Sequence, residues 1–276
     1  MMSAGGKPPA TILLLVGCGK MGGALLKGWL ERGAARHVLV VEPGTGADGF
    51  AGERLVERHK RPEEIPAAFS PDVVVFAVKP QAMEGVLKPY RRFVGRSLFL
   101  SIAAGKTLSY FARHIDDEAA VVRAMPNTPA AVGRGITIAV ANPRVTPTQR
   151  RIADVLLSAV GEVGWVEDEG LIDAVTAVSG SGPAYVFLLI ECLAKAGVAA
   201  GLPPDLAMRL SLATVAGSGE LARLSHEPAS KLREAVTSPG GTTRAALDVL
   251  MAPDGLESLI VKAVAAAARR SRELAD

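Results

Sequence analysis

The chain has 276 residues, of which 49% are hydrophobic and 21% are charged, so it is long enough for two domains and apolar enough to bury a core. Its 31 Lys and Arg residues exceed its 28 Asp and Glu residues only slightly, and no basic tract is interleaved with aromatic residues. The composition therefore gives no support for a nucleic acid as partner.

The first half of the chain alternates short apolar runs with longer amphipathic stretches. The predicted strands cover residues 12–16, 38–41, 72–78, 98–103, 119–123, 135–141 and 163–166. Helices are predicted between them, over residues 20–31 and from Pro147 onward. Continuous apolar strands are typical of parallel sheets that are covered on both faces. The pattern predicts a doubly wound α/β sheet, a Rossmann domain, over residues 9–166.

The second half of the chain consists of long helical stretches. They cover residues 184–197, 205–224, 229–236, 244–250 and 256–272. Residues 186–200 are hydrophobic nearly all round, which is typical of a helix buried in a bundle or against another subunit. The sequence therefore predicts a second, all-helical domain over residues 167–276.

The cysteines and the start of the chain bear on its compartment. Cys18 and Cys192 match neither a disulfide framework nor a metal-ligand spacing. Residues 1–10 are polar, and the apolar run after them is too short for a signal peptide or a membrane span. We expect a cytoplasmic protein that contacts no membrane and binds no metal.

A glycine motif follows the first predicted strand and opens the first predicted helix. It reads Gly17-Cys18-Gly19-Lys20-Met21-Gly22, which is G-x-G-x-x-G. In a dinucleotide-binding domain Gly17 allows the tight turn, Gly19 lets the backbone approach the pyrophosphate, and Gly22 lets the helix lie on the strand. The free N–H groups of the helix would face the phosphates. An ordinary glycine-rich turn is the alternative, but this context favours a bound dinucleotide.

Glu42 ends the second predicted strand, about 20 residues beyond the glycine motif, where a dinucleotide's ribose would lie. A carboxylate there accepts hydrogen bonds from both ribose hydroxyls and repels a 2′-phosphate, so Glu42 favours NADH over NADPH. The alternative is that the side chain points to solvent.

Two further loops follow predicted strands, Ala77-Val78-Lys79-Pro80 and the segment that contains Ala103 and Ala104. Ligands of open α/β sheets lie across the carboxyl ends of the strands, so we expect both loops to border the nicotinamide. Lys79 could act as a catalytic acid, but a lysine at a strand end is more often solvated or directed at a phosphate.

Two dense motifs lie in the helical half. In Ser179-Gly180-Ser181-Gly182-Pro183-Ala184-Tyr185, the proline suits the first turn of a helix and the serines can cap it. In Thr237-Ser238-Pro239-Gly240-Gly241-Thr242-Thr243, several backbone N–H groups are left free at a helix start, which makes a natural carboxylate cradle. A plain helix cap is the alternative in both cases.

Together these segments resemble pyrroline-5-carboxylate reductase. The resemblance covers roughly residues 13–274 and rests on motifs that occur in the family's order: the glycine motif, Ala77–Pro80, Ala103-Ala104-Gly105, Met125-Pro126-Asn127-Thr128-Pro129, Ser179–Tyr185 and Thr237–Thr243. It implies NAD(P)H-dependent reduction of 1-pyrroline-5-carboxylate to L-proline, the last step of proline biosynthesis. It also implies that the helical domain binds substrate and forms an obligate homodimer, often assembled into a decamer.

The resemblance also implies roles for single residues. The N–H groups of Gly240, Gly241 and Thr242 would hold the substrate carboxylate, with Ser238 ordering the loop, and Thr243 would hydrogen-bond the ring nitrogen. The family commonly has Ser, Asn or Arg after the second strand, where they receive the NADP phosphate. Here Glu42-Pro43-Gly44 stands instead, so we expect NADH or NADPH, with the choice open.

The chemistry agrees with this assignment. A cyclic imine can arrive already protonated, so its reduction needs orientation more than a strong protein acid. Related hydroxyacid dehydrogenases need a base, a lysine four residues beyond a Gly-x-Gly helix start; here that position is Val186. Two alternatives stay open: reduction of another cyclic imino acid, and a non-catalytic nucleotide-sensing protein on the same fold.

Overall fold

The computed structural model describes residues 11–275, which form two compact units. One unit takes in the chain up to Gly180 together with its last residues from Ala268. The other unit runs from Ser181 to Ala267. The composition of the chain changes earlier, near residue 167, which stays our prediction for the boundary between functional domains.

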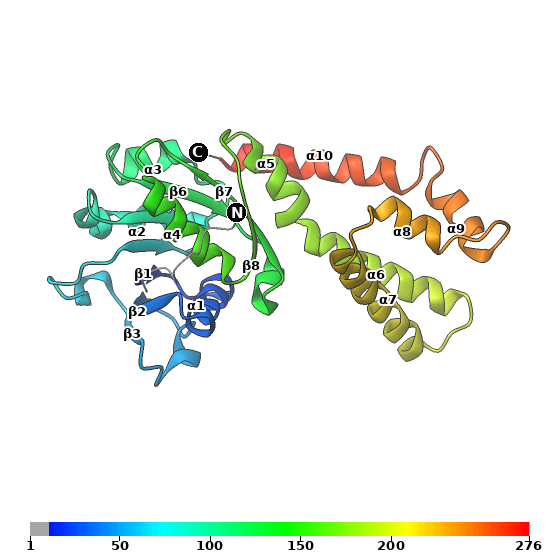
Figure 1. The fold of residues 1–276 in the computed structure, drawn as a ribbon, viewed down its shortest axis with the longest axis horizontal. Helices are drawn as coiled ribbons and strands as arrows, with labels where there is room; N and C mark the ends of the chain where they lie inside the picture. The colour runs from blue at the N-terminus through cyan, green and yellow to red at the C-terminus, as the bar shows by residue number, and fades with distance from the viewer. Residues whose placement is uncertain (1–10, 276) are drawn as a thin grey trace, which may run out of the picture. The chain divides into compact units, whose positions relative to one another are not determined.

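The first unit is built on an eight-stranded sheet in the order β3-β2-β1-β4-β5-β6-β7-β8 (Figure 1). The strands are β1 (Thr11–Val16), β2 (Ala35–Val41), β3 (Val56–His59), β4 (Val73–Phe76), β5 (Leu98–Ser101), β6 (Val121–Met125), β7 (Gly135–Ala141) and β8 (Gly161–Trp165). Within the described residues, neighbouring strands run parallel except for β6 and β7. The predicted Rossmann sheet is confirmed.

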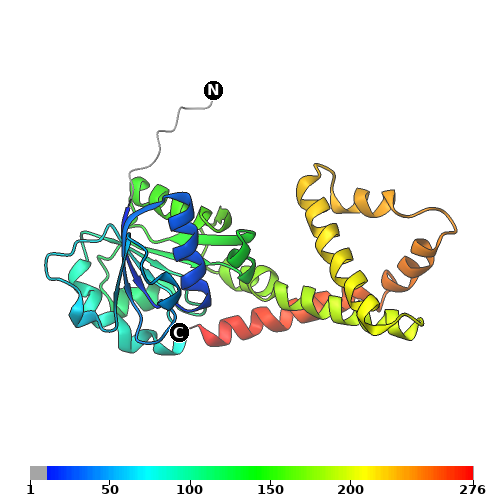
Figure 2. The same cartoon turned by 90° about the horizontal axis from the view of Figure 1, so that it is seen from below.

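Helices cover both faces of this sheet, and β1 shows why. Its alternate side chains enter different cores: Leu13 and Leu15 pack with α1 (Lys20–Arg32) and α4 (Pro147–Ser158), whereas Leu14 and Val16 pack with α2 (Met83–Leu87) and α3 (Leu108–His114). A strand that is apolar on both sides must be buried on both sides. In Figure 2 the blue helix α1 lies along one face.

Two features of the sheet differ from the sequence-based prediction. Strand β3 was not predicted, because its residues Val-Glu-Arg-His carry charges and lie at the edge of the sheet. Strand β7 runs antiparallel to β6 rather than continuing the parallel order. The connection between them holds only a short 3-10 turn, Thr128–Val132, and a parallel crossover needs a longer connection.

The chain leaves the sheet through α5 (Leu171–Val175) and a π-helical turn, Thr176–Gly180, neither of which the sequence pattern revealed. The end of α10 (Leu256–Leu274) packs against the same unit. There the Ser271 hydroxyl donates to Asp173 Oδ1 at 2.6 Å. The last residues of the chain therefore belong structurally to the first unit.

The second unit consists of helices, as predicted. They are α6 (Gly182–Ala199), α7 (Pro204–Leu224), α8 (Ala229–Ala235), α9 (Thr242–Leu250) and the first turns of α10. Figure 2 shows α7 crossing α6, and Gly197 lets the two approach, because a Cβ there would lie 3.1 Å from the Ala207 Cβ. Within residues 181–267 only Ala194, Ala207 and Ser211 are buried.

The surface of this helical unit is strongly apolar. Large side chains that are about half exposed include Phe187 (59%), Leu188 (56%), Leu210 (48%) and Leu212 (55%). Monomeric soluble proteins rarely leave contiguous apolar surface of this kind in water. These helices therefore need a partner to cover them.

Candidate active site

The carboxyl ends of three neighbouring strands enclose a cavity of about 540 Å³. Gly17 follows β1, Glu42 follows β2, and Val78 and Lys79 follow β4, and all four line the cavity. From β1 the chain runs outward to β2 and β3, then returns to β4 on the other side of β1. This reversal point is where open α/β sheets bind their ligands.

The three motif glycines have separable roles. Gly17 has φ +89°, and a Cβ on it would lie 2.9 Å from the Ala77 carbonyl. A Cβ on Gly22 would lie 2.5 Å from the Gly17 carbonyl oxygen, so both positions are closed by packing. A Cβ on Gly19 would meet no atom within 4 Å. Packing within the protein therefore does not require a glycine at position 19, but the absence of a side chain there leaves space open in the cavity.

That space fits the pyrophosphate of a dinucleotide. Gly19 lines the cavity and is also the N-cap of α1, where no side chain caps the helix in the described structure. The first-turn N–H groups of a helix have no partner within its own ladder and attract anions. A bare glycine, free donors and a helix N-terminus together make a cradle for phosphates.

Glu42 is held by the backbone rather than pointing to solvent. Its Oε2 accepts the Cys18 N–H at 2.7 Å, and its Oε1 accepts the Gly44 N–H at 2.8 Å. The alternative that Glu42 is merely a solvated side chain is therefore wrong. The carboxylate is fixed at the rim of the cavity, directly beside the glycine motif.

The Cys18 side chain does not line the cavity but points into the core, where it is 1% exposed. Burial, and next the negative charge of Glu42, raise the pKa of its thiol to about 11. At neutral pH this thiol is protonated and unreactive. Cys18 can therefore contribute to a ligand only through its backbone.

The cavity unites some of the predicted cofactor residues and not others. Lining it are Gly17, Gly19, Glu42, Ala77, Val78 and Lys79. Outside its lining are Cys18, Lys20, Met21, Gly22, Pro80, Ala103 and Ala104, which stay predictions. Lys79 is exposed at the rim, as a solvated or phosphate-directed lysine would be.

Sequence reasoning missed one wall of the cavity. The cavity is also lined by three residues that follow β3, Lys60, Pro62 and Glu63, and by Tyr90, which follows α2. The signal was weak, because β3 is a charged edge strand that carries no apolar run. Ligands of open α/β sheets lie across the carboxyl ends of the strands, so recognising β3 would have placed Lys60 beside the cavity.

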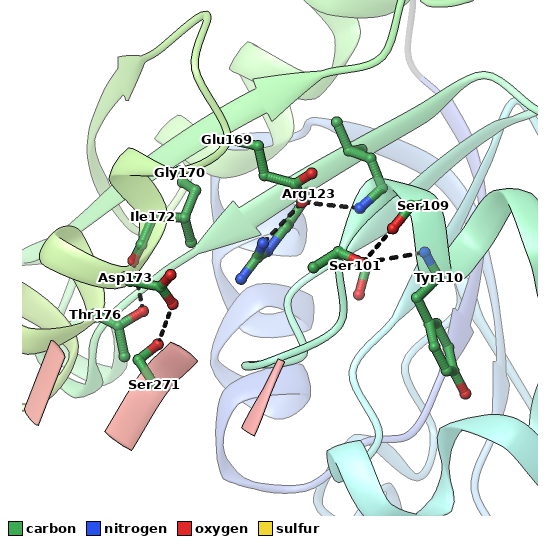
Figure 3. A network of polar contacts seen from close by, with 12 residues as sticks. Ser101, Ser109, Tyr110, Arg123, Glu169, Gly170, Ile172, Asp173, Thr176 and Ser271 are labelled. Atoms are coloured by element: carbon green, nitrogen blue, oxygen red, sulfur yellow. Dashed lines mark hydrogen bonds and ion pairs between the residues drawn. The ribbon is translucent and has the colours of Figure 1, made fainter. Parts of the chain in front are cut away.

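A partly buried ion pair lies beside the start of α3, the helix that follows the loop containing Ala103 and Ala104 (Figure 3). The Arg123 side chain, 5% exposed, donates to Glu169 Oε1 at 2.7 Å. The same oxygen accepts the Leu108 N–H at 2.8 Å, at the first residue of α3. Glu169 thus joins the middle of the sheet to the helix that begins just beyond the loop.

The end of the chain closes the same loop from another side. Gly105 has φ +74°, and a Cβ on it would lie 2.8 Å from the Leu274 carbonyl oxygen. The loop is therefore held by packing at Gly105, and the ion pair fixes the start of the helix that follows it. None of these contacts was visible in the sequence pattern, because they join residues far apart along the chain.

The proposed carboxylate loop lies in the helical unit. Gly240 has φ +67°, which favours glycine, and the Gly241 N–H donates to the Ser238 carbonyl at 3.1 Å. The Ser238 carbonyl is the acceptor within this turn, so Gly241 already uses its N–H there; that Ser238 orders the loop for substrate stays a prediction. Gly241 is also the N-cap of α9, and no side chain caps this helix. The N–H groups of Thr242 and Thr243 lie in its first turn and therefore have no carbonyl partner within the helix.

The serine motif behaves differently from its predicted capping role. Pro183 does lie in the first turn of α6. The N-cap, Ser181, makes no side-chain capping bond, and the Ser179 hydroxyl instead donates back to the Val175 carbonyl at 2.9 Å. The prediction that these serines cap the helix is wrong, because Ser181 makes no capping bond and Ser179 bonds back to the last residue of α5.

Two family models match the chain. Residues 169–274 match the one described as pyrroline-5-carboxylate reductase dimerisation, and residues 11–105 match the one described as NADP oxidoreductase, coenzyme F420-dependent. The first covers the apolar helices and the second covers the glycine motif and both cofactor loops.

Curated relatives and solved structures match over nearly the whole chain. Pyrroline-5-carboxylate reductases from Synechocystis sp. and Pseudomonas aeruginosa are 43% and 40% identical, over 94% and 96% of this chain and 97% of each relative. The structure of a pyrroline-5-carboxylate reductase from Coxiella burnetii is similar to this chain, with 34% sequence identity and a TM-score of 0.89 over 97% of this chain and 99% of that one. The structure of a pyrroline carboxylate reductase from Plasmodium falciparum, with NADP bound, has 30% identity and a TM-score of 0.81 over 96% of this chain and 98% of that one.

Proposed function

The chain belongs to the pyrroline-5-carboxylate reductase family, and we propose that it reduces 1-pyrroline-5-carboxylate to L-proline with a reduced nicotinamide dinucleotide, the last step of proline biosynthesis. The observation that carries this proposal is 43% identity to a reductase of that name over 97% of its length. The open phosphate cradle at Gly19 supports it independently.

The nucleotide-binding unit would position the cofactor. When bound, the dinucleotide supplies the hydride from its nicotinamide ring. Gly17 and Gly19 would hold the pyrophosphate with the first turn of α1, and Glu42 would hold the ribose. The loops at Val78 and at Ala103 would border the nicotinamide, with the Arg123–Glu169 pair holding the second loop in place.

The helical unit would hold the substrate. We assign its carboxylate to the N–H groups of Gly240 and Thr242, with Gly241 contributing only if its bond inside the turn is shared. Thr243 would orient the imine nitrogen. Orientation accounts for much of the rate when no strong acid or base is needed, and Val186 stands where a related hydroxyacid dehydrogenase would carry its lysine base.

The assembly we propose is a homodimer through the helical unit, which the exposed apolar faces of α6 and α7 and the dimerisation match support. Further assembly into a decamer is an extension of the same proposal. We also propose that each active site needs the partner subunit.

We place the enzyme in the cytoplasm, away from membranes. Residues 171–199 are long and apolar enough to cross a bilayer, and only 11% of an apolar 18-residue window within them is buried in this chain. A partner subunit accounts for that exposed apolar surface without a membrane, because the stretch falls within the dimerisation match. Retention of the purified protein in solution without detergent tests this.

Two measurements test the proposed function. The enzyme should turn over 1-pyrroline-5-carboxylate with a higher kcat/KM than the six-membered cyclic imino acid; the reverse order would make the larger ring the substrate. Thr243→Val should lower kcat while leaving cofactor affinity within about twofold, since it removes one hydrogen bond to the reacting ring. Unchanged kinetics would remove Thr243 from the mechanism.

A further inference from the structure

Glu42 selects between the two nicotinamide dinucleotides. We infer that this chain binds the dinucleotide with a free 2′-hydroxyl, NADH, in preference to the one with a 2′-phosphate, NADPH; the inference rests on the dinucleotide binding of the proposed function. It sets this chain apart from its Plasmodium falciparum relative, whose structure has NADP bound.

The first support is the fixed position of the carboxylate. Both oxygens are tied to backbone N–H groups, of Cys18 at 2.7 Å and Gly44 at 2.8 Å. A carboxylate oxygen can accept more than one hydrogen bond, so each keeps capacity for a ribose hydroxyl. Because both carboxylate oxygens are hydrogen-bonded to the backbone, the side chain cannot easily rotate away to admit a phosphate.

The second support is the charge around that position. A 2′-phosphate usually finds an arginine beside it. Three arginines lie on β3 or beside it: Arg58 pairs with Asp48 at 3.1 Å, Arg61 pairs with Glu64 at 2.9 Å, and Arg54 is exposed on the segment before β3. None of the three lines the cavity.

Two lysines line the cavity, on opposite sides of β1. Lys79 follows β4, whereas Lys60 and Glu63 follow β3, on the same side of β1 as Glu42. At this β2–β3 end of the cavity, Glu42 and Glu63 supply two carboxylates against the one ammonium of Lys60. A phosphate of about two negative charges would enter a region that is already negative.

The test is equilibrium binding of the oxidised cofactors by isothermal titration calorimetry, which needs no turnover. Wild type should bind NAD⁺ at least about tenfold more tightly than NADP⁺, a difference of one ordinary charge–charge contact. Glu42→Gln should bring the two affinities within about threefold, because it removes the charge but keeps the shape. Glu57→Gln, which removes a carboxylate from β3 outside the cavity, should leave the ratio unchanged.

Several outcomes overturn the inference. It fails if wild type binds NADP⁺ as tightly as NAD⁺, or if Glu42→Gln leaves the ratio as it was. Lys60→Ala is a second variant, which tests the charge account even if Glu42→Gln fails to fold. A selective loss of NADP⁺ affinity in Lys60→Ala would show that Lys60 recruits the phosphate and would contradict the inference. Tight NAD⁺ binding without turnover of 1-pyrroline-5-carboxylate would reject the proposed function and leave this inference standing.

Discussion

At the scale of single residues, the glycine motif separates folding from binding. Gly22→Ala should cost about 1–3 kcal/mol, because the new Cβ would press on the Gly17 carbonyl oxygen 2.5 Å away. Gly19→Ala meets open space and should leave the melting temperature nearly unchanged while weakening dinucleotide binding about tenfold or more. Thermal unfolding and calorimetry on both variants check this. Equal effects on binding and stability in Gly19→Ala would contradict the separation.

The buried thiol of Cys18 gives a pH-dependent prediction. Burial raises its pKa to about 11, so the folded state keeps the proton while an unfolded chain loses it at lower pH. This contribution to stability is full below the unfolded pKa and is lost as pH rises through the folded pKa.

In a Cys192→Ser variant, Cys18 is the sole thiol, and iodoacetamide should leave it unmodified from pH 7 to about 9. Alkylation should begin only as the pH approaches the raised pKa. Unfolding in urea at pH 8 serves as the positive control, since it exposes the thiol. Rapid modification of the folded variant at pH 7 would show that Cys18 is neither buried nor protonated.

Single residues also show how far the sequence could be interpreted. The places of Gly17, Gly19 and Glu42 in the cavity lining and the close packing at Gly22 followed from one motif, because they depend on a local turn and its spacing. Lys60 did not, since its place in the cavity depends on an edge strand without an apolar pattern. The involvement of the Gly241 N–H inside its own turn was also invisible, as a turn's hydrogen bonds depend on its dihedral angles.

At the scale of elements, the sequence predicted those with a strong apolar period and missed those defined by tertiary contact. Strand β1 and helix α1 nearly match their predicted bounds. The direction of β7 was open because the pattern gives a strand's existence but not its partner. The π-helical turn at Thr176–Gly180 falls between two predicted segments and has no signature of its own.

The Arg123–Glu169 pair links three elements, and its loss should be felt as stability. Glu169→Gln leaves a nearly buried guanidinium without its counter-charge, which costs on the order of 2 kcal/mol after allowing for the part of Glu169 that is exposed. We expect the melting temperature to fall by about 4–8 °C. Glu167→Gln, which breaks the exposed pair with Arg150, should shift it by less than about 2 °C. Equal shifts would mean that the buried pair has no special structural role.

At the scale of the whole molecule, the exposed apolar helices predict that the monomer is incomplete. Phe187→Asp places a charge on the α6 surface and should convert the assembly to smaller species with little turnover. The nucleotide-binding unit should still bind dinucleotide within about threefold of wild type. Light scattering measures the size of the assembly, and calorimetry measures the dinucleotide affinity. Leu55→Asp, on the first unit, is the control and should leave the assembly intact. A fully active monomer would refute the shared site.

The most direct test of imine reduction is turnover itself. Purified enzyme is given 1-pyrroline-5-carboxylate with NADH or NADPH, while loss of reduced nicotinamide and formation of proline are followed together. We expect one proline for each dinucleotide oxidised, with the higher kcat/KM for NADH. No proline with either cofactor, from an assembled enzyme that binds the dinucleotide, would contradict the account.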